Sequence, residues 1–422
     1  MTTPAAPPQA RGGIMTHYTS LAIFLLGALA LSLPSGYSLG ALMLVLASPI
    51  LLIRPRPLEL TREDQAILLV LGLYFAVTAL SAWLDGQGSR GLDKPSRFLL
   101  AIPALLLLIA YPPRLSWLWH GLAIGGMATG GLAIWQKLIE GTSRAGGFTQ
   151  IIQYGNISLL LGMLCLAGLG WAWAQPRRRA WLVWLGLGAA GGLLASLLSG
   201  SRGGWLVAPL MLLVLYWAEG RRLPRRMQLG LVMAVLIAGA ISYTLPELGV
   251  QQRVHTATDN VANYLSGENR DTSVGLRFQM WGAAGELFQQ RPLFGWGEHG
   301  YREAMAEMAV RGEIAPRVAE FHHAHNEWID AAAKRGIIGI TALLCLYLVP
   351  LVAFARRLNA PSPACRALAA AGSLLPIAYL GFGATQAFLE HNSGVMIYAF
   401  WLAVLWAMFR QTTATTAKDT TT

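Results

Sequence analysis

The sequence predicts an all-α integral membrane protein with about twelve membrane-spanning helices and one large external loop. Three observations support this fold class. Of the 422 residues, 55% are hydrophobic and only 13% are charged, whereas a soluble domain is about 25% charged. The apolar residues gather in runs close to the roughly 20 residues that a helix needs to cross the hydrocarbon core. Finally, Lys and Arg gather in alternate connections between these runs, as the cytoplasmic loops of membrane proteins require.

The predicted spans follow from the apolar runs in chain order. They cover residues 18–33, 36–53, 65–84, 97–111, 115–139, 152–174, 180–198, 204–218, 227–245, 336–355, 366–389 and 393–409. The first run is as long as a signal-peptide core, but the spans that follow it favour a retained first span. The chain therefore divides into spans one to nine (18–245), a loop (246–335) and spans ten to twelve (336–409). We expect a disordered N-terminus at 1–17 and a short tail at 410–422.

The charges in the connections predict the orientation. Fourteen basic residues fall in the loops assigned to the cytoplasm, namely Arg54, Arg56, Arg62, Arg114, Arg177, Arg178, Arg179, Arg221, Arg222, Arg225, Arg226, Arg356, Arg357 and Arg366. The short external loops hold five, namely Arg90, Lys94, Arg97, Arg144 and Arg202. This asymmetry predicts that both termini are cytoplasmic. It also accounts for the net charge of +11 without nucleic acid as a partner, since no basic helix or aromatic-interleaved patch is present.

The segment 246–335 is mixed in charge and too long for a passive connector, and long ordered loops are usually functional. Apolar spacing predicts a helix over 273–290, ended by Pro292 and the Gly295–Gly297 pair. Shorter helices are expected over 301–310 and 324–334, and Gly336 should separate the last of these from the tenth span.

Ionisable residues are scarce inside the predicted spans and gather instead in the external loops. Proton-coupled transporters and pumps place such residues within their spans, so this distribution disfavours a transporter. Cys165, Cys345 and Cys365 have no metal-ligand spacing and are expected to be packing residues.

The first candidate motif is SGSRGGW at 199–205, in an external turn. Its glycines, among them Gly203, allow a tight turn or the close approach of a ligand. Arg202 adds a planar cationic fork that suits phosphate oxygens. The alternative is an interfacial arginine whose side chain only reaches toward the headgroups.

Two further motifs lie in the large loop. Arg277 sits on the predicted helix beside Phe278 and Trp281, where an isolated arginine would more often be a solvated charge. His322, His323, His325 and Asn326 are expected to open the third helix, with His322 sharing a helix face with His325 or Asn326. A His-x-x-His pair can ligate metal, but no carboxylate or cysteine of suitable spacing completes such a site. A single histidine acting as a base is the favoured interpretation, and Asn326 could be only a helix cap.

In order and spacing, these motifs resemble the O-antigen ligase and polymerase superfamily. The resemblance rests on SGSRGGW and on the pattern formed by Arg277, Trp281, Pro292, Gly295 and Gly297, followed by His325, Asn326, Trp328, Gly336 and Gly339. It covers about 200–340 by motif and the whole chain by topology.

The resemblance implies a metal-independent membrane glycosyltransferase of GT-C-like fold in the bacterial inner membrane. Such an enzyme takes a glycan from undecaprenyl pyrophosphate at the periplasmic face, and ligases pass it to lipid A–core in lipopolysaccharide biosynthesis. Arg202 and Arg277 correspond to residues that hold the donor pyrophosphate, and His325 corresponds to the catalytic histidine. Gly203, Trp281 and Asn326 would support the site. The expected partners are the lipid-linked donor, the lipid A–core acceptor and membrane lipids, with no cofactor and no metal.

The chemistry of the residues agrees with these roles. Two arginines can neutralise a departing pyrophosphate with charge-assisted hydrogen bonds. A histidine close to them should have a lowered pKa and stay neutral, as a base must. Three alternatives remain open, namely an O-antigen polymerase, a protein O-oligosaccharyltransferase that uses the same donor, and a flippase or transporter of lipid-linked glycans. The sugar, the acceptor, the stereochemical outcome and the oligomeric state stay undetermined at this point.

Overall fold

The computed structural model describes residues 13–245, 249–269 and 271–419, and all regular secondary structure within these ranges is helical. The all-α class is therefore confirmed. Residues 1–12 of the predicted disordered N-terminus lie outside the described residues, and the first helix already begins at Ile14. The bundle contains α1 (Ile14–Ala28), α2 (Leu39–Ala47), α3 (Ile50–Ile53), α4 (Arg62–Leu84), α5 (Gly88–Gly91), α6 (Asp93–Ala110), α7 (Leu115–Leu138), α8 (Ile151–Trp173), α9 (Arg178–Ser199), α10 (Arg202–Ala218), α11 (Arg225–Thr244), α16 (Glu327–Ala355), α17 (Pro363–Gly383) and α18 (Asn392–Asp419).

Each predicted span coincides with helical structure, but the helices differ in how well they suit a membrane. Among the described residues, eight helical segments are long and apolar enough to cross a bilayer. The shorter apolar helices α1 and α10, together with α6 and α7, occupy the remaining predicted spans. The chain is thus a polytopic helical protein of membrane type, and the count of twelve spans stays a prediction.

Glycines allow the helices on one side of the bundle to pack closely. A Cβ atom at Gly188 of α9 would lie 2.6 Å from the Cα of Ala123, and one at Gly130 of α7 would lie 2.6 Å from the Cα of Gly191. Such distances are shorter than real contacts, so side chains at these positions would push α7 and α9 apart. Small residues at helix interfaces are the usual means of close packing in membranes, where burial of apolar surface gives little drive for association.

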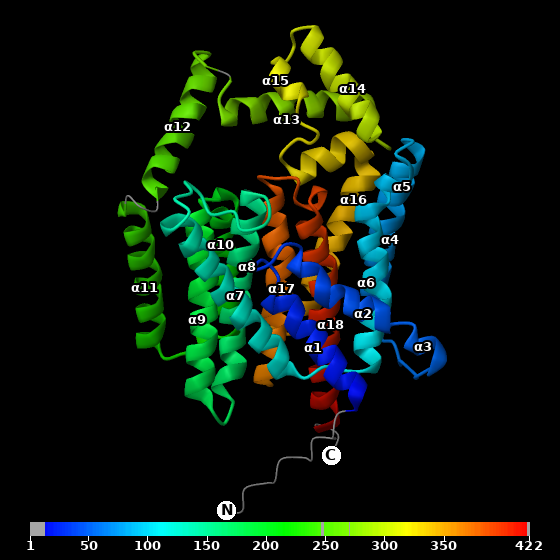
Figure 1. Ribbon diagram of the computed structural model, residues 1–422, viewed down its shortest axis with the longest axis vertical. Helices are drawn as coiled ribbons and strands as arrows, with labels where there is room; N and C mark the ends of the chain where they lie inside the picture. The colour runs from blue at the N-terminus through cyan, green and yellow to red at the C-terminus, as the bar shows by residue number, and fades with distance from the viewer. Residues whose placement is uncertain (1–12, 246–248, 270, 420–422) are drawn as a thin grey trace, which may run out of the picture.

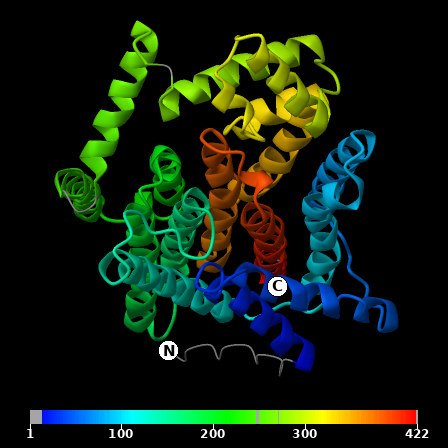
Figure 2. The same cartoon turned by 45° about the horizontal axis from the view of Figure 1, so that its top comes forward.

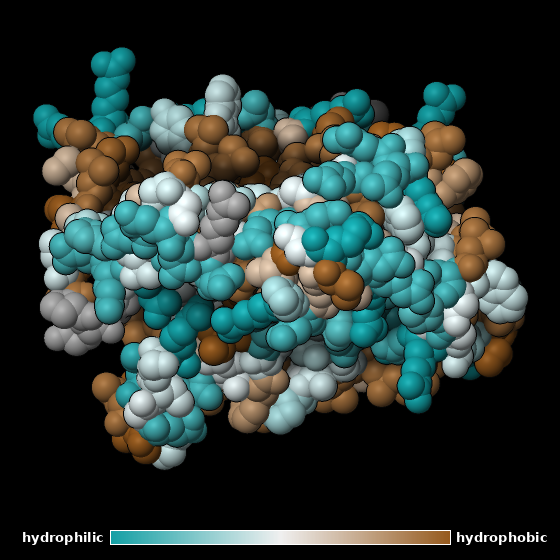
Figure 3. Space-filling view, turned by 90° about the horizontal axis from the view of Figure 1, so that it is seen from above, coloured by the Kyte–Doolittle hydropathy of each residue, from teal (hydrophilic) through white to brown (hydrophobic). Residues whose placement is uncertain are grey.

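The large loop folds into α12 (Val250–Ser266), α13 (Ser273–Gln290), α14 (Gly297–Val310) and α15 (Pro316–Ala319). These helices lie at one end of the bundle, whereas α1 begins and α18 ends at the other (Figure 1). Figure 2 shows α13 to α15 above α16 to α18, with α11 and α12 standing to one side. Seen from this end, the surface is mostly polar over the loop helices and more apolar toward its margins (Figure 3).

The loop helices have a small core of their own. Leu276, Met280 and Leu287 of α13 pack with Tyr301 and Met305 of α14. This core fixes α13 with the bounds that the sequence predicted, and Thr272 caps its start by accepting a hydrogen bond from the backbone N–H of Gly275. The second predicted helix also exists, but it begins at Gly297 rather than at residue 301.

The third predicted helix is wrong at its start. It begins at Glu327 rather than at residue 324, because the Asn326 side chain accepts hydrogen bonds from the backbone N–H groups of Trp328 and Ile329 and so caps it. The break at Gly336 is confirmed, since this residue has a φ of 61° inside α16. The backbone N–H of Ile337 donates instead to the carbonyl of Pro292 at 2.8 Å.

Candidate active site

The three motif segments meet at the loop end of the bundle, together with the connection between α17 and α18. The indole Nε1 of Trp281 on α13 donates to the carbonyl of Ala324 at 2.9 Å. Asn326 Nδ2 donates to the carbonyl of Ala384 at 3.2 Å. A Cβ at Gly203 would collide with Thr385, so this glycine lets the start of α10 approach the same connection. The three predicted supporting residues thus join the segments to one another.

His325 occupies a constrained position in the loop before α16. Its φ of 49° is in the left-handed region, which non-glycine residues rarely adopt. The prediction that His322 shares a helix face with His325 or Asn326 is therefore wrong, because the helix starts only after Asn326. Strain of this kind persists only where the surrounding structure enforces it.

The backbone around His325 is held by buried ionic groups on α16. The Asp330 carboxylate accepts from the backbone N–H of Ala324 at 3.0 Å, and the Lys334 ammonium donates to the carbonyl of His322 at 2.8 Å. Lys334 also pairs with Asp330 at 3.1 Å and with Glu298 at 2.7 Å. These contacts hold the backbone of residues 322–325 against α16.

The hydrogen bonds of His325 determine which ring nitrogen is available. Its Nδ1 lies 2.6 Å from Gln386 Oε1, and Gln386 Nε2 lies 2.8 Å from His391 Nε2. An amide oxygen only accepts, so His325 Nδ1 carries a proton in this arrangement and Nε2 keeps its lone pair. Gln386 in turn donates to His391. Among the residues that the structure describes, no hydrogen bond involves His325 Nε2, so this nitrogen is available as a base when the imidazole is neutral.

Electrostatics favours the same neutral form. Burial lowers the pKa of His325 below its ordinary value, the hydrogen bond to Gln386 acts in the opposite direction, and the positive charge of Arg277 lowers the pKa further. The lowered pKa agrees with the sequence-based expectation, although burial is a larger cause than the neighbouring guanidinium. Burial likewise lowers the pKa of His323 to about 3.

Arg202 and Arg277, predicted to bind the donor, are also brought near each other. Arg202 is the first residue of α10, and its Nη1 donates to the carbonyl of Arg253 at 3.1 Å. Burial lowers the pKa of Arg277, and the charge of Arg202 lowers it further. Because Arg277 also acts on the pKa of His325, these three residues form one electrostatic neighbourhood.

Sequence reasoning missed two further arginines in this neighbourhood, Arg144 and Arg253. Arg144 Nε donates to the carbonyl of Ser199 at 2.8 Å, and Arg253 Nη1 donates to the carbonyl of Gly200 at 3.3 Å. Gly200 has a φ of 62°, and a Cβ there would collide with the Arg253 guanidinium. Burial lowers the pKa of both arginines, with Arg202 adding to the effect. Arg144 was recognised only as an external charge, and Arg253 had no motif around it.

We call Arg144, Arg202, Arg253 and Arg277 the arginine cluster. Within the described part of the chain, none of the four forms an ion pair with a carboxylate. Half-buried guanidinium groups that repel one another and lack acidic partners are suited to a multiply charged anion such as pyrophosphate. Among those same residues, no group of three or more His, Cys, Asp and Glu side chains is placed to hold a metal ion.

Comparison with known proteins agrees with this site. Residues 187–344 match the family model described as O-Antigen ligase. This segment of the chain is similar to the O-antigen ligase family. The segment that carries this O-antigen ligase match includes Arg202, Arg253, Arg277 and His325. A protein of Haemophilus influenzae that is described as uncharacterized is 27% identical over 385 residues, which cover 91% of this chain and 96% of that relative.

Proposed function

We propose that the protein transfers a glycan from a polyprenyl pyrophosphate to a hydroxyl group of an acceptor, as an O-antigen ligase acting on lipid A–core. The observation that carries this proposal is the arginine cluster without acidic partners beside His325, whose Nδ1 is held by Gln386. One part of the site suits a pyrophosphate leaving group, and the other suits a base.

The proposed reaction assigns one role to each group. The acceptor oxygen attacks the anomeric carbon of the donor sugar, and its proton passes to Nε2 of His325. The bond between the anomeric carbon and the pyrophosphate oxygen breaks, and the pyrophosphate leaves with the electron pair. The arginine cluster stabilises the negative charge that develops on this oxygen, which lowers the barrier to departure.

The position of the site supports a setting at the periplasmic face of the inner membrane. The site lies at the end of the bundle away from the start of α1 and the end of α18 (Figure 1), and the basic loops favour cytoplasmic termini. A lipid tail would then lie along the bundle while the sugars remain in water. A polymerase or a protein O-oligosaccharyltransferase would use the same donor chemistry, so the acceptor distinguishes these alternatives.

The decisive experiment is transfer in vitro with purified protein and lipid-linked glycan. Lipid A–core, a second lipid-linked glycan and a pilin-like protein are offered separately as acceptors. The proposal expects product with lipid A–core alone. Product with lipid-linked glycan would indicate a polymerase, and movement of the donor across vesicles without transfer would indicate a flippase.

A further inference from the structure

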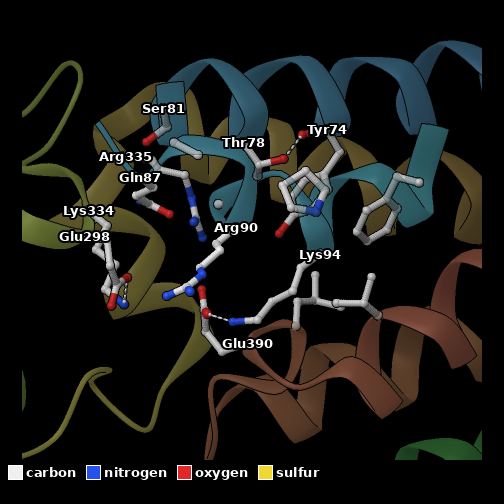
Figure 4. Close-up of a pocket in the computed structure, with 16 residues that line it drawn as sticks. Tyr74, Thr78, Ser81, Gln87, Arg90, Lys94, Glu298, Lys334, Arg335 and Glu390 are labelled. Carbon is white, nitrogen blue, oxygen red and sulfur yellow. Dashed lines mark hydrogen bonds and ion pairs between the residues drawn. The ribbon is translucent and has the colours of Figure 1, made fainter. Parts of the chain in front are cut away.

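A second polar cavity lies at the same end of the bundle as the arginine cluster but shares none of its residues. It has a volume of about 220 Å³ and is bounded by α4, α5 and α6 on one side and by α16, Leu389 and Glu390 on the other. A single water molecule needs about 10–15 Å³, so this space admits a sugar substituent. Arg90, Lys94, Lys334 and Arg335 line it, together with Glu298 and Glu390, and Figure 4 shows several of these side chains pointing into it.

The charges in this cavity are not balanced. Lys94 pairs with Glu390 at 2.6 Å, and Lys334 pairs with Glu298 and with Asp330. Among the described residues, neither Arg90 nor Arg335 has an ion pair or hydrogen bond. Two guanidinium groups therefore line the cavity without a direct ion pair, and Glu390, which pairs with Lys94, compensates the charge of Arg335 only through space. This leaves a site that suits a phosphate or carboxylate group.

The cavity shares its walls with the elements that hold His325. Leu389 and Glu390 line it, and they belong to the connection from which Gln386 and His391 orient the His325 ring. Lys334 lines it as well and holds the carbonyl of His322. The cavity thus lies among the elements that position the proposed base, and none of the arginine cluster lines it. An acceptor bound there would be held on the side of the site that carries the base.

We propose that this cavity binds an anionic substituent, a phosphate or carboxylate, carried by the glycan of the acceptor. The inference rests on the proposed function, since it assigns the acceptor class of the same active site. Arg335 and Arg90 contact the anion, while the two paired lysines shape the wall. An acceptor held there by its charge presents a neighbouring hydroxyl group toward His325.

The test compares Arg90→Gln and Arg335→Gln with wild type and with the control Arg302→Gln, which changes an exposed arginine of α14 outside the cavity. Two acceptors are used, a lipid-linked oligosaccharide bearing phosphate monoesters and the same molecule after phosphatase treatment. With saturating donor, each cavity variant should raise KM for the phosphorylated acceptor by about tenfold to a hundredfold. KM for the dephosphorylated acceptor and KM for the donor should stay within twofold of wild type.

Three outcomes would overturn the inference. An equal rise in KM for both acceptors would mean that the arginines have only a structural role. Arg90→Gln is the variant less prone to misfold, because Arg90 is exposed. Unchanged KM values in both variants would mean that the cavity does not bind the acceptor. The third outcome has two parts. Wild type shows the same KM for both acceptors, and it loses activity in vesicles that lack phosphatidylglycerol whereas the cavity variants do not. The bound anion would then be a lipid headgroup.

A binding measurement separates this inference from the proposed function. Affinity of the purified protein for the phosphorylated acceptor is measured without donor. Loss of affinity in Arg335→Gln and Arg90→Gln, with no transfer by wild type from any polyprenyl donor, would keep the anion site and reject the transfer reaction. Transfer by wild type without any preference for the phosphorylated acceptor would keep the reaction and reject the anion site.

Discussion

The side-chain amide oxygen of Gln386 lies 2.6 Å from Nδ1 of His325, and this contact leaves Nε2 as the ring nitrogen available to a substrate. The neutral imidazole is the active form of the proposed base, and burial lowers its pKa. Activity should therefore be retained at neutral pH and fall only as the pH drops through a value below the ordinary 6.5 or so. A profile of the single-turnover transfer rate against pH measures this acid limb, and a midpoint at or above the ordinary value would contradict the assignment.

Replacement of Gln386 by glutamate should shift the acid limb of the pH profile to higher pH. A carboxylate beside Nδ1 stabilises the imidazolium, so the acid limb should shift upward by about one pH unit or more. Gln386→Leu, which removes the hydrogen bond without adding charge, should lower kcat and leave KM for the donor unchanged. An unmoved limb in Gln386→Glu, with the protein folded, would show that another group controls the profile.

His325→Ala should reduce transfer by about 10²–10⁴-fold, because a general base contributes an effect of this size. Donor binding should persist, since the arginine cluster is intact. His322→Ala is the matched control, because its side chain is exposed and only its backbone carbonyl is used by Lys334. His323→Ala should be intermediate, since its Nδ1 accepts from the His325 backbone N–H at 3.3 Å. Transfer at the wild-type rate by a well-expressed His325→Ala protein would contradict the role of His325 as the base.

The arginine cluster should show opposite effects on donor binding and stability. Arg277→Gln should raise KM for the donor by about tenfold to a hundredfold, yet raise the melting temperature of the donor-free protein because a repulsive charge is removed. Arg202→Ala, Arg144→Ala and Arg253→Ala should also weaken donor binding, and lysine should restore little at positions 202 and 277. The control Arg317→Gln changes an exposed arginine on α15. Loss of both affinity and melting temperature in Arg277→Gln would indicate misfolding.

Transfer should continue in excess chelator. The proposed charge stabilisation comes from guanidinium groups. The two acidic residues that follow His325 at the start of α16, Glu327 and Asp330, are used by backbone N–H groups and by Lys334. The assay compares initial rates before and after chelation, with magnesium or manganese added back. Complete loss followed by recovery with either ion would reveal a metal site.

The orientation can be tested by cysteine labelling in a background without Cys165, Cys345 and Cys365. Gln251 near the start of α12 and Arg178 at the start of α9 are both exposed. In Figure 1, α12 stands at the loop end of the bundle, whereas α9 begins at the opposite end. An impermeant reagent should label a cysteine at 251 in intact cells and one at 178 only after permeabilisation. Labelling of both positions from one side would reject the predicted topology.

Local sequence signals predicted the helices well and the site only in part. The bounds of α13 followed from its apolar stripe and from Pro292, and the break at Gly336 followed from a glycine before an apolar run. The start of α16 was wrong because Asn326 suits either a helix interior or a cap, and only the folded backbone decides between them. Gln386 and Arg253 were missed because their roles depend on contacts across 61 and 53 residues respectively, which periodicity and spacing do not encode.

Within the described residues, the arginine cluster has no ion pair with a carboxylate, and this also bears on the end of the catalytic cycle. In the proposed reaction, the lipid pyrophosphate that leaves has one more ionisable oxygen than it had in the donor, so the same guanidinium groups hold the product at least as firmly as the substrate. Turnover would then be limited by product release rather than by bond breaking. A burst of the first product equivalent, followed by a slower steady rate that added undecaprenyl pyrophosphate suppresses, is the kinetic signature expected of such a site. The rate at which the lipid pyrophosphate product is removed from the membrane would then limit the steady-state rate of glycan transfer.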